Sequence, residues 1–104
     1  MKLKLHSLAE NDLKIGLKYY HEISPKLGKR FLSNIDKQFH NILKSPNTYK
    51  YETKTTQKVI MKKFPYIIIY EQYEDIIMIL AIFHTKQNPN KLDKRQDTHS
   101  NSIN

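Results

Sequence analysis

The first half of the chain carries two segments in which apolar residues recur every three or four positions, a spacing that predicts amphipathic helices. The first runs from Leu8 to about Ile23, and Ser7 begins a capping-box pattern before it. The second is capped by Ser24 and ends at Ser45-Pro46-Asn47. Their tight connection predicts an antiparallel helical hairpin. The expected apolar positions are Ala9, Leu13, Leu17, Tyr20, Leu27, Phe31, Ile35, Phe39, Ile42 and Leu43. Of these, Phe31, Ile35, Phe39 and Leu43 are expected to lie in the core.

The remaining pattern has a period of two or is continuously apolar, which predicts strands. The expected strands are Lys2 to His6, Gln57 to Phe64, Tyr66 to Tyr73 and Ile76 to Phe83. The last is apolar at every position, as in a central strand with both faces covered. The order predicts an α+β fold: an N-terminal strand and an antiparallel helical hairpin packed on one face of a mainly antiparallel β-sheet. Gly16, on the apolar stripe of the first helix, indicates that another group packs closely there.

Composition and charge narrow the classes of function and the kinds of partner that the chain can have. The 104 residues suit one domain, and 18 Lys and Arg against 10 Asp and Glu give a net charge of +8, which favours an acidic partner such as nucleic acid or an acidic protein. The chain has no Cys, which excludes disulfides, thiolate metal sites and Cys nucleophiles. The histidines lack metal-ligand spacing, so neither metal nor cofactor is expected. No apolar stretch suits a signal peptide or a membrane span, so a cytoplasmic protein is expected.

Several short segments carry a more specific signal. They are Ala9-x-x-Asp12-Leu13, Tyr19-Tyr20, Ser24-Pro25-x-Leu27-Gly28-x-Arg30-Phe31-Leu32, Ile42-Leu43-x-x-Pro46, Lys62-Lys63-Phe64-Pro65-Tyr66-x-Ile68-x-Tyr70 and Ile79-x-Ala81-Ile82-Phe83-His84-Thr85-x-x-Asn88-Pro89. In this order they resemble the RelE/ParE superfamily of bacterial toxins. We therefore expect a toxin domain over residues 1–93. The polar residues 94–104 are expected to form a disordered tail.

The resemblance implies a toxin of a type II toxin–antitoxin module, often labelled a plasmid stabilisation protein. Such a toxin is held inactive by a cognate antitoxin and meets operator DNA only through the antitoxin complex. RelE-like members cleave mRNA in the ribosome without metal, whereas ParE-like members bind and inhibit DNA gyrase. No membrane partner is implied.

The choice between the two branches depends on side chains. The resemblance suggests a set of residues for a nuclease, namely Lys62, Lys63, Tyr70, His84 and Lys86. It suggests an overlapping set for binding a target or antitoxin, namely Lys58, Lys62, Lys63, Tyr66, His84 and Lys86. Three departures weigh against the nuclease. Ile67 stands where RelE-like nucleases carry a strand Arg, Gln87 stands where the family usually has Arg before Asn-Pro, and no Tyr follows Tyr73. Lys is only a point charge, whereas Arg clamps a phosphate with two donors.

Several candidates have a simpler structural interpretation. His84 has a pKa range suited to acid–base chemistry, but a histidine at a strand end also bonds neighbouring backbone groups. Tyr66 and Tyr70 can stack on bases or pack in the core with bonded hydroxyls. The lysines of the helical hairpin, Lys26, Lys29, Lys37 and Lys44, are expected to form a solvated face.

The sequence therefore favours a ParE-like toxin that acts by binding a target such as DNA gyrase. Two alternatives stay open: a RelE-like mRNA endoribonuclease, and a degenerate member that binds antitoxin without being toxic.

Overall fold

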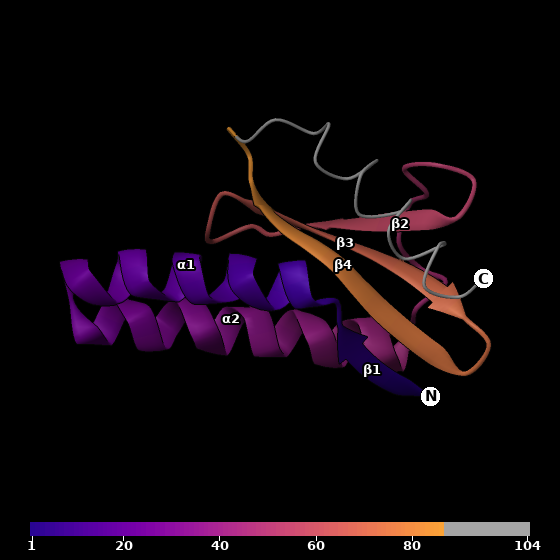
Figure 1. Ribbon diagram of the computed structural model, residues 1–104, viewed down its shortest axis with the longest axis horizontal. Coiled ribbons are helices and arrows are strands. Elements are labelled where there is room, and N and C mark those ends of the chain that lie inside the picture. Colours follow the sequence, from indigo (N-terminus) through magenta and orange to yellow (C-terminus); the bar gives the residue numbers. More distant parts are fainter. Residues whose placement is uncertain (87–104) are drawn as a thin grey trace.

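The computed structural model describes residues 1–86 (Figure 1). Its elements are β1 (Lys2–Leu5), α1 (Ser7–Ile23), α2 (Pro25–Lys44), β2 (Thr56–Ile60), β3 (Tyr66–Tyr73) and β4 (Ile76–His84). The sheet has the order β1-β4-β3-β2; β1 runs parallel to β4, and the other neighbours are antiparallel. The predicted α+β class is confirmed. The predicted tail, residues 94–104, and the end of the predicted domain lie outside the described residues.

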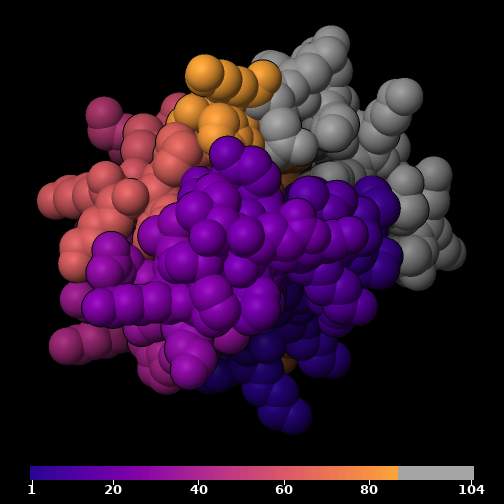
Figure 2. All heavy atoms as spheres, turned by 90° about the vertical axis from the view of Figure 1, so that its left-hand side faces the viewer, coloured from indigo at the N-terminus to yellow at the C-terminus, as the bar shows by residue number. Residues whose placement is uncertain are grey.

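The hairpin of α1 and α2 turns at one residue. Ser24 donates its backbone N–H to the carbonyl of Tyr20 and so closes α1, while its hydroxyl accepts from the Leu27 N–H at 3.0 Å and opens α2. Seen from this end, the helices lie in front and the end of β4 rises behind them (Figure 2). One serine thus fixes both helix ends, and its predicted role as the cap of the second helix is confirmed.

The start of α1 differs from the prediction. The N-cap is His6, whose Nδ1 accepts from the Leu8 N–H at 3.1 Å, and Ser7 is already the first helical residue. His6 also donates its backbone N–H to the carbonyl of Ile79, at 2.8 Å. Because His6 is still bonded to β4, the helix starts directly behind it and the capping role falls to the imidazole.

The core between the hairpin and the sheet is aromatic. Tyr20, Phe31, Phe64 and Tyr66 pack with ring centroids 4.9 to 6.2 Å apart. A Cβ added at Gly16 would lie 2.9 Å from Cζ of Phe31 and 3.2 Å from the Tyr66 hydroxyl. The close approach predicted at Gly16 is therefore present, and it lets α1 lie directly on the aromatic cluster.

Two predictions need correction: the end of β2 and the burial of Leu43. The prediction that β2 continues to Phe64 is wrong, because β2 ends at Ile60. Pro65 has no N–H to continue the ladder, so the chain turns, and Met61 donates its backbone N–H to the carbonyl of Tyr66 at 3.0 Å.

The prediction that Leu43 is core is also wrong: Ile42 takes the inward position on α2, and Leu43 is 36% exposed.

β4 is an inner strand of the sheet and lies between β1 and β3. Its register with β3 places His84 opposite Tyr66 and shifts between Ile69 and Tyr70. Residues of β3 and β4 on the sheet face away from the hairpin form a second buried cluster: Ile69, Leu80, Ala81 and Phe83. This confirms the prediction that the continuously apolar strand is central and buried on both faces.

Within residues 1–86, no helix has the length and apolarity that crossing a membrane requires.

Candidate functional site

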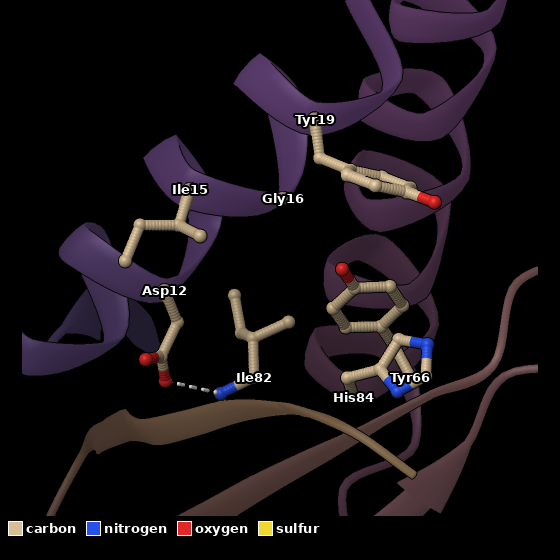
Figure 3. A pocket seen from close by; sticks show the side chains of 7 residues that line it. All are labelled: Asp12, Ile15, Gly16, Tyr19, Tyr66, Ile82 and His84. Carbon is tan, nitrogen blue, oxygen red and sulfur yellow. Dashed lines mark hydrogen bonds between the residues drawn. The ribbon is translucent and has the colours of Figure 1, made fainter. Parts of the chain in front are cut away.

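A pocket of about 330 Å³ opens between α1 and the end of β4, and we call it the apolar pocket (Figure 3). It is lined by Asp12, Ile15, Gly16, Tyr19, Tyr66, Ile82 and His84. In Figure 3, Ile15 and Tyr19 come from α1 on one side, and Ile82, His84 and Tyr66 come from the strands on the other. Most of its lining is apolar side chain, so it suits an apolar group better than a charged one.

Asp12 fixes the position of α1 against β4. β1 pairs with β4 only from Ile76 to Ile79, and beyond that point the chain enters α1. The carboxylate of Asp12 then accepts from the N–H of Ile82 at 2.9 Å, taking the place of a strand partner. Sequence reasoning gave Asp12 no role. The available signal was an acidic residue on the inner face of an amphipathic helix, between Ala9 and Gly16.

Tyr66 and His84 form the floor of the pocket. Their rings meet edge to face with centroids 5.2 Å apart. Burial, followed by the neighbouring Tyr20, raises the pKa of Tyr66 to about 12. The Tyr66 hydroxyl also shares a side-chain hydrogen bond with Tyr20, which contributes to the raised pKa. Nδ1 of His84 accepts from the Lys86 N–H at 3.2 Å, which is the structural role considered for a strand-end histidine.

A second pocket of similar volume, about 330 Å³, lies between α2 and the turn that follows β2. We call it the basic groove; it is lined by Asn34, Lys37, Gln38, Asn41, Tyr49, Ile60, Met61, Lys62 and Lys63. Lys62 and Lys63 are exposed in the turn, and Lys37 faces them from α2. Lys37 is thus more than part of a solvated helix face. Three ammonium groups among side-chain amides suit carboxylates or phosphates.

The remaining candidate residues lie elsewhere. Tyr70 is fully buried, and its hydroxyl donates to the carbonyl of Pro46. Burial, followed by the nearby Tyr49, raises its pKa to about 12. Lys58 forms an ion pair with Glu52, with Nζ and Oε2 2.7 Å apart. Lys86 is exposed two residues after His84.

The five residues suggested for a nuclease do not line a single pocket among those described. Lys62 and Lys63 line the basic groove, His84 lines the apolar pocket with Lys86 beside it, and Tyr70 lies in the core. Among residues 1–86, no group of three His, Asp or Glu side chains is arranged to hold a metal ion.

Comparison with known proteins decides the family. The family model described as "ParE toxin of type II toxin-antitoxin system, parDE" matches residues 3–89. The chain belongs to this ParE toxin family. Toxin ParE2 of Mycobacterium tuberculosis, from the strains CDC 1551 and H37Rv, is 26% identical over 93 residues, covering 88% of this chain and 89% of the relative.

A solved structure supports the ParE fold. A chain of the chromosomal ParDE toxin–antitoxin system from P. aeruginosa superposes with a TM-score of 0.71 at 20% identity, covering 81% of this chain and 95% of that one. The superfamily resemblance and its toxin role in a type II module are thus confirmed. As a ParE toxin, the protein has an antitoxin as its partner.

Proposed function

We propose that this ParE toxin acts by binding and inhibiting DNA gyrase in the cytoplasm, and not by cleaving RNA. The observation that carries the proposal is the separation of the candidate catalytic groups among the basic groove, the apolar pocket and the core. Binding a protein target needs surfaces of suitable shape and charge, which both pockets provide.

Metal-free RNA cleavage sets a stricter requirement. A base for the 2′-hydroxyl, cations for the phosphate and an acid for the leaving oxygen must reach one phosphodiester together. The hydroxyl of Tyr70 is already bonded to Pro46, and Lys62 and Lys63 line a different pocket from His84. His84 and Lys86 lie close together, as do Lys62 and Lys63, and neither pair supplies an arginine fork. These facts support a binding toxin.

The basic groove fits the antitoxin side of the same proposal. Lys37, Lys62 and Lys63 attract carboxylates, so we propose that an acidic segment of the antitoxin folds over this groove and neutralises the toxin. Operator DNA is then met only through the antitoxin complex.

Induction of the toxin without its antitoxin tests the target. Growth, the DNA-damage response and mRNA ends are recorded together after induction. Gyrase inhibition predicts filamentation and a damage response with intact mRNA. Prompt codon-linked mRNA cuts would contradict the proposal and favour a RelE-like nuclease. Normal growth at confirmed expression would also contradict it, in favour of a non-toxic member.

The antitoxin contact has its own test. Lys62→Glu with Lys63→Glu should weaken antitoxin binding at least tenfold in low salt, because two positive charges beside an acidic partner become negative. Lys26→Glu with Lys29→Glu makes the same charge change on exposed positions of α2 outside the groove. It should change affinity far less. Equal effects from both pairs would show that only the overall charge of the toxin matters.

A further inference from the structure

A polar and cationic stripe runs along the flank of α2 on which the basic groove lies. Its residues follow one another at spacings of four, three, four and three positions, which keeps them on one side of a helix. We call it the α2 stripe; it consists of Arg30, Asn34, Lys37, Asn41 and Lys44. The three central residues line the basic groove, and the two outer cations extend the same surface along the helix. From end to end the stripe measures roughly 21 Å, at about 1.5 Å per residue.

Acidic residues are kept away from this surface. Among the described residues that line the basic groove, none is Asp or Glu. The one acidic residue of α2, Asp36, lies 3.7 Å from His40 and lines a separate pocket. Glu52, in the loop before β2, is paired with Lys58. Ion pairs within the described chain therefore leave the charge of the groove and the α2 stripe uncompensated, which favours an anionic occupant.

The neutral side chains between the cations suit a phosphate backbone. Asn34 donates its Nδ2 to the carbonyl of Arg30 at 2.8 Å, which ties this amide to the helix. Gln38 and Asn41 also line the groove and carry amide donors. Lysine, asparagine and glutamine side chains are usual partners of DNA phosphates, and such contacts position a protein without reading bases. The groove therefore suits a nucleic acid recognised by its backbone.

The groove lacks the aromatic surface with which proteins hold single strands. Among the described residues that line it, the only aromatic is Tyr49, which packs against the core and meets Tyr70 edge to face with centroids 6.4 Å apart. Single-stranded DNA and RNA are held by stacking their bases on aromatic rings. Ile60 in the groove is 61% exposed, but the neighbouring Met61 is buried. A duplex, which presents its phosphates and keeps its bases stacked inside, fits this surface better.

We propose that the basic groove and the α2 stripe bind the phosphate backbone of the duplex DNA on which gyrase acts, so that the toxin contacts the enzyme and its DNA together. The length of the stripe corresponds to roughly six base pairs at about 3.4 Å each. This contact rests on the gyrase target of the proposed function and adds a second ligand to it. Because it reads no base, recognition of operator sequences stays with the antitoxin complex. An acidic antitoxin segment in the groove competes with DNA for Lys37, Lys62 and Lys63.

The test measures binding of the purified toxin, without antitoxin or gyrase, to a labelled duplex of random sequence by fluorescence anisotropy. Lys62→Gln with Lys63→Gln removes two cations from the groove. The groove variant should bind the duplex at least tenfold more weakly in low salt, and the slope of log affinity against log salt should become shallower by about two. Thermal unfolding verifies that each variant is folded.

The matched control makes the same charge change elsewhere. Lys2 and Lys4 are exposed on β1, at the opposite edge of the sheet from β2. Lys2→Gln with Lys4→Gln should stay within threefold of the unsubstituted toxin. Equal losses from both pairs would overturn the site, because only the overall charge of the toxin would then matter. Absence of duplex binding by the unsubstituted toxin in low salt would also overturn it.

Two further measurements separate the duplex from other occupants. Ile60→Ser should leave duplex affinity within twofold, because a phosphate backbone makes no use of this side chain. A tenfold loss would overturn the backbone contact in favour of apolar docking. Tighter binding to a single strand of DNA or RNA than to the duplex of the same sequence would overturn it in favour of a single-strand site.

A supercoiling assay keeps this proposal distinct from the proposed function. The groove variant should need at least tenfold more toxin to inhibit gyrase, and the control pair should not. Undiminished inhibition by a groove variant that no longer binds DNA would overturn the DNA contact and leave gyrase as the target. Failure of the unsubstituted toxin to inhibit gyrase would refute the target, whereas the anisotropy measurements would still decide whether the groove binds DNA.

Discussion

The apolar pocket and the basic groove have about the same volume but are built in different ways. The apolar pocket is backed by the core: Gly16 and Tyr66 in its wall lie directly against Phe31. The basic groove is made mainly of side chains on the surface of α2 and on the turn after β2. The shape of the apolar pocket therefore depends on the packed core, whereas the binding properties of the basic groove depend on the charge of its surface side chains. Substitutions should separate the two.

The largest effect is expected behind the apolar pocket. Phe31→Ala removes a fully buried ring from the aromatic cluster and should lower the free energy of unfolding by about 3–5 kcal/mol. Asn34→Ala, one turn along α2 in the basic groove, should change it by less than about 0.5 kcal/mol. Urea unfolding measures both. Similar losses would show that the two pockets depend equally on the core.

Alkaline pH should weaken the fold through its buried tyrosines. The pKa values of Tyr66 and Tyr70 are raised to about 12, whereas an unfolded tyrosine titrates near 10. Between pH 10 and 12 the unfolded chain loses protons that the folded chain keeps, so stability falls as pH rises. The full loss is about 3 kcal/mol for each tyrosine and is absent below pH 10.

Tyrosine variants check this assignment. Tyr70→Phe should unfold with a shallower pH dependence than the unsubstituted protein from pH 10 to 12, as measured by urea midpoints. Tyr73→Phe is the control, because Tyr73 is exposed at the end of β3. An unchanged pH slope in Tyr70→Phe would contradict the raised pKa.

A smaller effect is expected at the attachment of α1. Asp12→Ala removes the acceptor of the Ile82 N–H and should cost about 1–3 kcal/mol of unfolding free energy. Asp36→Ala, on the exposed face of α2, should cost much less. Hydrogen exchange of the Ile82 amide gives a local measurement. Undiminished protection in Asp12→Ala would show that the carboxylate does not hold this amide.

The smallest effect is expected at the surface ion pair of β2. Lys58→Ala breaks the contact with Glu52 and should cost less than about 1 kcal/mol, because both side chains are partly exposed. Raising the salt concentration should reduce even this difference. A loss of several kcal/mol would mean that Lys58 supports the loop before β2 by more than this ion pair.

Much of the fold follows from local sequence. The periodic stripes, the Ser24 cap and the continuously apolar β4 depend on neighbouring residues, and each appears as predicted. One error occurs where a distant contact decides: β4 holds the His6 N–H, so Ser7 is not the cap. The early end of β2 is a local effect, because Pro65 cannot donate to the strand ladder and the chain turns before it.

The candidate site was less predictable because distant contacts decide which residues it contains. The residue types were informative, but spacing along the chain does not show that Lys37 joins Lys62 and Lys63, or that Asp12 reaches β4. Tyr66 and Tyr70 both lie in β3 and face the same core, yet of the two only Tyr66 lines either pocket described above. Tertiary packing decides which side chains reach the surface, and that packing depends on contacts between residues far apart in the chain, which the spacing of residues in one sequence does not reveal.

The central claim is that the toxin acts by binding gyrase. The most direct measurement is DNA supercoiling by purified gyrase, titrated with toxin whose folding and antitoxin binding have been verified. We expect supercoiling to be lost as toxin is added and restored when antitoxin is supplied. Full supercoiling in a tenfold excess of such toxin would contradict the claim.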